Sequence, residues 1–234
     1  MNSGDSQRLA AANNAAWCIS IWRSHGLEVR RQHGMVACVG APPRFYPNAV
    51  TVDPKTDPAT QRAWLAELAG AADAAVAVKD SFQTLELAAE GYSELFQASW
   101  IRRDARLAAG PRRLDWRLVE DAEDLTAWEL AWQDGQPSGP RIFLPSLLAD
   151  RSLGILAGVS SGRIVAGCVL SVTGRVVGLS HVFGDYGDVV RAATAQFDRH
   201  DLVGYERSEA LEDALACGFE PVGRLTVWSR EPQP

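Results

Sequence analysis

Residues 202–231 carry the clearest pattern of apolar and polar positions in the chain. Residues 202–205 form a short apolar run of the kind that a buried strand needs. Apolar residues at helical spacing follow, between Ser208, which can cap a helix, and Gly218, where a helix can end because glycine enters the left-handed conformation without steric cost. A second apolar run begins at Phe219. The pattern therefore predicts a strand, a helix and a strand, in that order.

The same order of elements recurs earlier in the chain. An apolar run over residues 75–80 predicts a strand, residues 85–91 predict a helix that ends at Gly91, and residues 95–101 predict another strand. Aligning Gly91 with Gly218 brings the two stretches into register. We interpret this agreement as the trace of an ancient duplication. The alternative is chance, because strand, helix, glycine and strand is a common order in α/β proteins.

Further helices and strands are expected on both sides of a basic, polar stretch at residues 102–113. The expected helices cover residues 5–26, 57–68, 121–132, 143–148 and 188–199. The expected strands cover residues 27–31, 35–39, 49–52, 115–119, 156–159, 164–172 and 176–183. Three strands of the second half follow one another as a meander, with turns at Gly162 and Gly174. This mixture of helices and strands predicts an α/β protein.

The closing stretch resembles the carboxyl-terminal end of the GCN5-related N-acetyltransferase (GNAT) superfamily. The resemblance rests on Tyr205-Glu206 at the end of a strand, on Gly218-Phe219 at the end of a helix, and on residues 220–223 in the closing strand. It implies an α/β (α+β) fold of two GNAT-like halves in tandem, each with a mixed central sheet flanked by helices.

The resemblance also implies where the domains begin and end. It covers residues 114–231 well and the first hundred residues only weakly. We therefore expect a degenerate GNAT-like half over residues 1–104, a linker over residues 105–113 and a GNAT-like domain over residues 114–234. The second half is the one that we expect to be active.

Composition narrows the classes of function. The 234-residue chain has a formal net charge of −6, and so acidic a chain is a poor candidate for nonspecific nucleic-acid binding, which needs a basic face. No apolar run approaches the length of about 20 residues that crosses a membrane, and the first residues lack a signal-peptide pattern. We therefore expect a cytoplasmic protein without nucleic-acid or membrane partners. The four cysteines lack the spacing of a zinc or redox site, so we expect buried thiols and no metal.

The resemblance implies a cofactor, acetyl-CoA or another acyl-coenzyme A, held at the loop after the fourth strand of the second half. Backbone N–H groups and a helix N-terminus face the pyrophosphate in such a loop. The residues that match this position here are Val182, Phe183, Gly184, Gly187 and Arg191.

The loop departs from the family pattern of Arg or Gln, two residues, Gly, one residue, and Gly or Ala. It has no arginine, and its two glycines flank Tyr186. Asp185 and Asp188 put carboxylates where a pyrophosphate would lie, and we expect Asp188 to cap the next helix. Two alternatives stay open: a different loop geometry in which Arg191 or Arg199 reaches the donor, or a fold that has lost the donor.

Candidate catalytic residues lie at the ends of two strands that diverge in this fold. His181 ends one of them, and the usual pKa of histidine suits proton transfer near neutral pH, so it is the expected general base. Tyr205 and Glu206 end the other strand and are expected to face the same cleft. The alternatives are a histidine that is merely hydrogen-bonded within its strand and a Glu206 that ends its strand in solvent.

Substrate-binding side chains are expected in both halves. Asp185 and Tyr186 lie in the loop of the second half, and Lys79 and Asp80 end the matching strand of the first. The alternative for Asp80 is a helix cap or a solvated strand end.

Two hypotheses of function follow. The first is acyl transfer from an acyl-CoA to the amine of a small molecule. The second is a repurposed or catalytically degenerate GNAT fold that binds a small metabolite or acts without CoA. A subunit that binds a protein partner is a third class, and a homodimer stays open.

Overall fold

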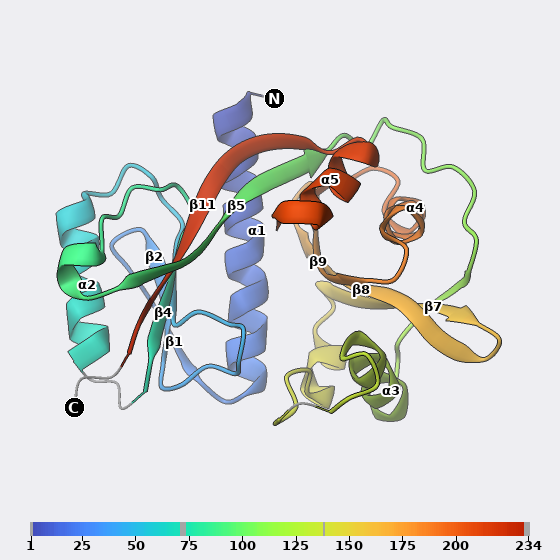
Figure 1. The fold of residues 1–234 in the computed structure, drawn as a ribbon, viewed down its shortest axis with the longest axis horizontal. Helices are drawn as coiled ribbons and strands as arrows, with labels where there is room; N and C mark the ends of the chain where they lie inside the picture. The colour runs from blue at the N-terminus through green and yellow to red at the C-terminus, as the bar shows by residue number, and fades with distance from the viewer. Residues whose placement is uncertain (1, 71–73, 138, 232–234) are drawn as a thin grey trace. The chain divides into compact units, whose positions relative to one another are not determined.

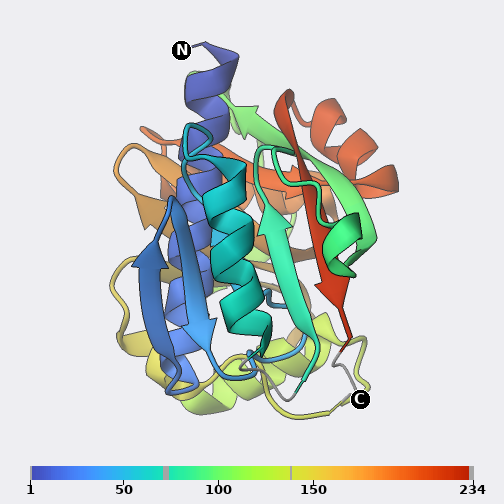
Figure 2. The ribbon, with the colours of Figure 1, turned by 90° about the vertical axis from the view of Figure 1, so that its left-hand side faces the viewer.

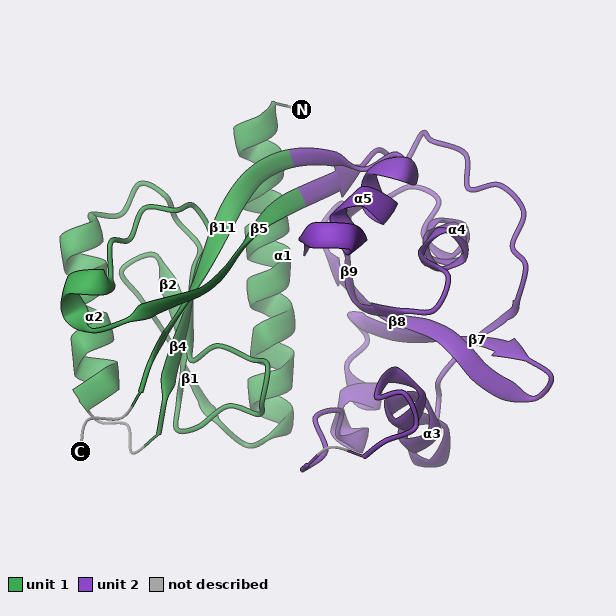
Figure 3. Ribbon diagram, in the orientation of Figure 1, with its two compact units in different colours: residues 1–100, 222–234 green, residues 101–221 purple. Residues whose placement is uncertain are grey.

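The computed structural model describes residues 2–70, 74–137 and 139–231. The chain forms two compact units, unit 1 with residues 1–100 and 222–234 and unit 2 with residues 101–221 (Figure 3). Two long strands, β5 (Ser93–Arg103) and β11 (Glu220–Arg230), contribute residues to both units. Among the described residues, no helix combines the length and the apolar character that a membrane crossing requires.

Unit 1 is a sheet with one long helix on each face. Its described strands follow the order β1 (Glu28–Gln32), β2 (Met35–Val39), β3 (Ala49–Thr51), β4 (Val76–Asp80), β11 and β5. Strands β3 and β4 are parallel, whereas β4 and β11 are antiparallel with Val78 opposite Trp228. The helices α1 (Ser3–Ser24) and α2 (Pro58–Gly70) cover opposite faces (Figures 1 and 2).

Unit 2 has the meander that the sequence predicts, followed by a parallel strand. Its elements are β6 (Asp115–Leu118), α3 (Ala122–Trp132), the 3₁₀ turn η2 (Pro145–Ala149), β7 (Leu153–Ser160), β8 (Arg163–Thr173), β9 (Val176–Phe183), α4 (Tyr186–Gln196), β10 (Asp201–Glu206) and α5 (Ser208–Ala216). Helix α3 covers one face of the sheet, and α4 and α5 cover the other (Figure 1). The core beneath α4 contains Val177, Leu179, Val189 and Phe219.

The predicted strand, helix and strand near the end of the chain are confirmed as β10, α5 and β11. Gly218 has a φ of +85°, the left-handed conformation that the pattern predicts. The prediction that Ser208 caps α5 is wrong. Ser208 is the first helical residue, and the N-cap position is Arg207, whose side chain makes no cap hydrogen bond.

The matching stretch of the first half keeps its strands but not its helix. Between β4 and β5 the structure has only a three-residue 3₁₀ turn, η1 (Ala88–Glu90), so the helix predicted from residue 85 is wrong. The buried Asp80 carboxylate accepts the backbone N–H groups of Phe82 and Leu85, at 3.3 and 2.7 Å, which holds the chain in a turn. Gly91 still ends this turn at a φ of +81°. The duplication itself stays a prediction.

The last strand of the chain belongs largely to the sheet of the first unit. Residues 222–230 of β11 lie between β4 and β5 in unit 1, whereas α5 just before them lies in unit 2 (Figure 3). The predicted linker, residues 105–113, is separated from the end of β5 by one residue. The closing strand of the predicted second half therefore completes the sheet of the first.

Candidate functional site

Strands β9 and β10 pair over part of their length and then separate. Their parallel pairing runs from Val176 opposite Asp201 to Gly178 opposite Val203. Strand β9 continues to Phe183 and β10 to Glu206, both beyond this paired segment. Sites in α/β proteins form at the carboxyl ends of parallel strands, so this opening is the candidate active site.

A β-bulge lies in β9 at the start of this opening. Val169 pairs with Ser180 and Gly167 pairs with Phe183, so two residues of β9, His181 and Val182, stand opposite Cys168. His181 has a φ of +54°, which is uncommon for a residue with a side chain. Bulges bend a strand and redirect side chains, and they are frequent beside active sites.

The bulge turns His181 toward α3. Its ring makes edge contacts with Trp132 and Phe143, with ring centres 5.1 Å apart in both cases, and Phe183 contacts Trp128 of α3 in the same way at 5.4 Å. Val182 packs instead into the core beneath α4. The ring of His181 therefore lies on the face of the sheet opposite to α4.

Glu206 and Tyr186 meet on the α4 face of the opening. The Tyr186 hydroxyl, at the first residue of α4, donates to Glu206 Oε1 across 3.4 Å, and the tyrosine ring packs edge-on to Phe219 with centres 6.5 Å apart. Tyr205, the preceding residue of β10, points to the other face because side chains alternate along a strand. The structure thus pairs two of the predicted site residues.

Burial raises the pKa of the Glu206 carboxyl to about 7, although the hydrogen bond from Tyr186 lowers it in part. Burial and the negative charge of Glu206 raise the pKa of Tyr186, so the phenol keeps its proton. A carboxyl with a pKa near 7 can accept and release a proton at neutral pH, as a general base must.

Asp185 caps α4, and the prediction that Asp188 does so is wrong. Asp185 Oδ1 accepts the N–H of Asp188 at 2.6 Å. Asp188 is 1% exposed and accepts hydrogen bonds from the backbone N–H of Arg113 at 2.7 Å, that of Leu114 at 3.1 Å and Trp116 Nε1 at 3.0 Å. Asp188 therefore anchors the chain that leads into β6.

Two arginines balance the two carboxylates of this loop. Arg191 lies 3.1 Å from Asp188 and 3.6 Å from Asp185, and Arg113 lies 3.9 Å from Asp185. Burial alone would raise the pKa of Asp188, but the hydrogen bonds from the Arg113 backbone, Trp116 and Arg191 outweigh it and lower the pKa. The loop is therefore not the purely acidic surface that its sequence predicts.

The loop fits the phosphates of an acyl-CoA in part. The first turn of α4 and the guanidinium groups of Arg113 and Arg191 are suited to bind an anion. The half-exposed carboxylate of Asp185 already contacts the helix start and both arginines, so it would compete with a phosphate for them. Gly184 has a φ of +80°, and a Cβ there would lie 2.6 Å from Ala166 Cβ, so this position accepts only glycine. Arg113 lies in the predicted linker, and sequence reasoning missed it because its only signal is a basic neighbourhood.

The predicted substrate residues of the first half are buried. Lys79 is 4% exposed and donates from Nζ to Asn14 Oδ1 at 2.7 Å, and Asp80 is fully buried and holds the turn after β4. Both side chains are used within unit 1, so they are not part of the site described above. Cys18, Cys38 and Cys168 are buried thiols, and Cys217 is half-buried. Among the described residues no three potential metal ligands cluster.

Comparison with solved structures shows what fold this is. A GCN5-related N-acetyltransferase from Kribbella flavida aligns over 96% of both chains, with a TM-score of 0.64 and 15% identity. A GNAT-family putative acetyltransferase from Novosphingobium aromaticivorans aligns over 91% of this chain and 97% of its own, with a TM-score of 0.56 and 14% identity. A GCN5-related N-acetyltransferase from Sphaerobacter thermophilus covers 89% of this chain and 76% of its own, with a TM-score of 0.54 and 12% identity.

The chain therefore has the fold of the GCN5-related N-acetyltransferases, as the sequence resemblance implies. Neither a protein-family model nor a curated protein matches the sequence. At identities of 15% or less the likeness concerns the fold, and the chemistry has to be argued from the residues of the site.

Proposed function

We propose that this protein transfers an acyl group from an acyl-CoA, acetyl-CoA or another, to the amine of a small molecule. The proposal rests chiefly on Glu206, a carboxyl with a pKa of about 7 at the end of β10, where β9 has separated from it. The fold supports it, because the proteins from Kribbella flavida and Novosphingobium aromaticivorans that share the fold bear the name acetyltransferase.

In this proposal Glu206 accepts the proton of an incoming ammonium group, which frees the nitrogen lone pair for attack. When bound, the acyl-CoA supplies a thioester whose carbonyl carbon forms the new C–N bond while its C–S bond breaks. Tyr186, whose phenol burial keeps protonated, gives the proton of its hydroxyl oxygen to the leaving sulfur and takes back the second proton that the nitrogen loses as the amide forms, and Glu206 then releases its proton to solvent. Arg113 and Arg191 would hold the phosphates beside the first turn of α4.

The direct test is acyl transfer itself, followed by release of free CoA thiol from acetyl-CoA with a panel of small amines. A rise in melting temperature with acetyl-CoA in the absence of acceptor measures donor binding separately, since a ligand at a hundred times its dissociation constant adds about 2.7 kcal/mol of stability. Donor binding with no transfer to any amine would count against the proposed reaction.

A second candidate function is a GNAT fold that binds a metabolite without CoA. One observation favours it: the Asp185 carboxylate already accepts an N–H of the first turn of α4, where a pyrophosphate would bind. No shift of the melting temperature with acetyl-CoA, combined with binding of a small metabolite, would select this alternative.

The variant Asp185→Asn separates these candidates. Asparagine caps a helix about as well as aspartate, so the fold is retained while a negative charge near Arg113 and Arg191 is removed. If an acyl-CoA binds here, we expect its affinity to rise several-fold, because a partly exposed pair of charges contributes about 0.2–1 kcal/mol. Calorimetry with CoA measures the change, and Asp213→Asn on α5 is the matched control. Weaker CoA binding by Asp185→Asn would contradict this account of the loop.

A further inference from the structure

Phe45, in the loop that joins β2 to β3, is exposed to solvent and has an unfavourable backbone conformation. Among the described residues it is the most exposed of the large apolar side chains, at 70%. The Tyr46 N–H donates to the Pro43 carbonyl at 3.2 Å, so residues 43–46 form a tight turn with Phe45 in its third position. Phe45 has a φ of +72°, which turns of this kind usually leave to glycine. Because most of the ring lies in solvent, burial within unit 1 offsets little of this strain.

The contacts around Phe45 hold its loop in this conformation. Tyr46, the next residue, is buried and packs edge-on to Trp17 with ring centres 6.1 Å apart. At the base of the loop, Asn48 Nδ2 donates to the Gly40 carbonyl at 3.3 Å. A side chain on a loop that is already ordered loses little conformational freedom on binding, so Phe45 is preorganised for contact with a partner.

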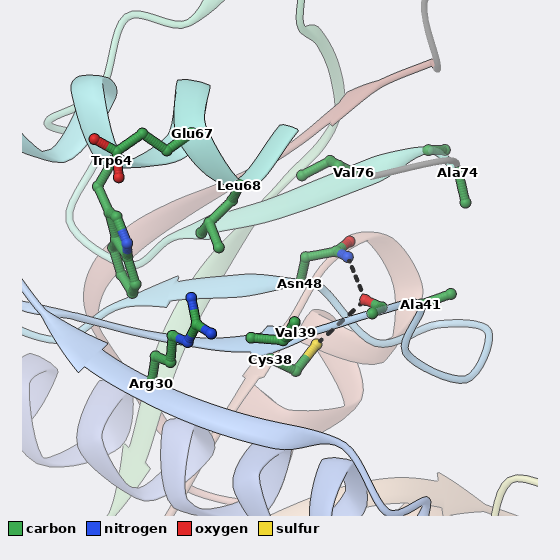
Figure 4. A pocket seen from close by; sticks show the side chains of 12 residues that line it. Arg30, Cys38, Val39, Ala41, Asn48, Trp64, Glu67, Leu68, Ala74 and Val76 are labelled. Atoms are coloured by element: carbon green, nitrogen blue, oxygen red, sulfur yellow. Dashed lines mark hydrogen bonds between the residues drawn. The ribbon is translucent and has the colours of Figure 1, made fainter. Parts of the chain in front are cut away.

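The base of the same loop lines a pocket between α2 and the sheet (Figure 4). Its volume is about 320 Å³, whereas an apolar cavity of about 150 Å³ already holds benzene. Trp64 and Leu68 of α2 line one side of the pocket and Val39 of β2 lines the other (Figure 4). Gly40 and Ala41, at the start of the loop, complete the lining. The pocket therefore has the size and the apolar lining that an aromatic ring requires.

Phe45 lies close to this pocket but does not fill it. It is three residues before Asn48, which lines the pocket, and a chain spans at most about 3.6 Å per residue, so their Cα atoms are within about 11 Å of each other. The ring of Phe45 is nevertheless exposed. A projecting ring and a recess that fits a ring thus lie side by side on unit 1. A two-fold symmetric interface has this property, because each copy uses the same patch of surface.

We propose that two copies of this chain associate through unit 1, with Phe45 of each copy inserted into the pocket of the other. The ring packs against the partner subunit's Trp64, as aromatic pairs do when they are buried. Aromatic anchors in apolar pockets dominate the affinity of protein interfaces. The reciprocal exchange occupies both rings and both pockets, so the assembly stops at two copies. The site proposed for acyl transfer lies in unit 2, and this association does not depend on it.

Sedimentation equilibrium of the full-length protein tests the proposal, and we expect a dimer that dissociates on dilution. Phe45→Gly should raise the Kd of the dimer by about 100-fold or more, because each dimer loses two aromatic anchors. Glycine adopts a positive φ without strain, so the melting temperature of the dilute, monomeric protein should stay the same or rise. A fall in that melting temperature would contradict the proposal, because Phe45 would then serve packing within unit 1. Leu95→Ala removes another exposed apolar side chain of unit 1 and is the matched control.

A second variant tests the pocket. Leu68→Trp should fill it and weaken the dimer as Phe45→Gly does, while the melting temperature shows that the protein is folded. A mixture of the two variants joins an intact Phe45 to an open pocket at one of the two contacts, so it should associate more tightly than either variant alone. The proposal is overturned if the native protein is a monomer at millimolar concentration, if Leu95→Ala weakens the dimer as much as Phe45→Gly, or if the mixture associates no more tightly than its components.

Discussion

Glu206→Gln is expected to lower the rate of acyl transfer by about 10²- to 10⁴-fold, the usual contribution of a general base. Glutamine keeps the size of the side chain and can still accept the hydrogen bond from Tyr186, but it cannot take a proton from the acceptor amine. Steady-state kinetics at pH 8 measures the loss. Because donor binding does not use this carboxyl, the affinity for acetyl-CoA should stay the same.

The pH profile provides an independent signature of the same residue. A base with a pKa of about 7 must be deprotonated to act, so kcat/KM should rise with pH up to about 7 and then level off. The Glu206→Gln variant should lose this rising limb. A profile that keeps the limb in the variant would show that another group is the base.

Stability changes cannot account for the expected loss. The folded state raises the pKa of Glu206 above the usual value of a glutamate, so ionising it costs stability as the pH rises from that usual value toward 7. Glu206→Gln removes this cost and should unfold at the same or a higher temperature at pH 8. Glu209→Gln, an exposed change in the first turn of α5, is the matched control and should leave the rate unchanged.

His181 is the competing candidate for the base. Its ring packs against Trp132 and Phe143, and each such aromatic pair contributes about 0.5–1.5 kcal/mol, so His181→Ala should lower stability by that amount for each pair. His181 is the base if the His181→Ala variant loses more turnover than Glu206→Gln does and still melts near the temperature of the native protein.

Asp188→Ala is expected to lower the free energy of unfolding by about 3–5 kcal/mol, the cost of removing one partner from a buried ion pair. Its carboxylate receives hydrogen bonds from the backbone N–H groups of Arg113 and Leu114 and from Trp116, and it pairs with Arg191. Alanine leaves the three N–H donors without their acceptor, and Arg191 keeps only its longer contact with Asp185, at 3.6 Å. Urea unfolding followed by tryptophan fluorescence measures the change, and Asp188→Asn offers a milder variant should alanine prevent folding.

The neighbouring cap provides the comparison. Asp185→Ala removes one hydrogen bond at the start of α4 and should cost about 1 kcal/mol. The folded state lowers the pKa of Asp188, so its contribution is complete above the usual pKa of aspartate and is lost as the pH falls below it. The difference in the free energy of unfolding between Asp188→Ala and Asp185→Ala should therefore become smaller as the pH falls. Equal losses at neutral pH would show that Asp188 is not the anchor of the segment before β6.

The sequence by itself determined the elements whose signals are local. Helix and strand periodicities, with glycine at the left-handed turn, located β10, α5 and β11, and Gly218 has the positive φ expected of it. These signals work because the spacing of apolar residues and the conformational freedom of glycine act within a few residues. The position of Glu206 at a strand end follows from the same local pattern.

The local pattern failed at two aspartates whose hydrogen-bond partners it does not reveal. After β4, the Asp80 carboxylate accepts the backbone N–H groups of Phe82 and Leu85, two and five residues further on, and holds a turn there. Asp188 has the sequence of a helix cap, yet its acceptor oxygens serve the backbone of Arg113, 75 residues away. Nothing in the spacing of residues around either aspartate signals these partners.

The face on which His181 lies was also decided by the tertiary structure. Val177 and Leu179 pack beneath α4, and strict alternation would put His181 on that side with Glu206. The bulge opposite Cys168 adds one residue to β9, which shifts the alternation and turns His181 toward Trp132. The bulge depends on the register between β8 and β9, and register is set by the packing of whole strands. For that reason the residues of the site could be named from the sequence, whereas their pairing required the fold.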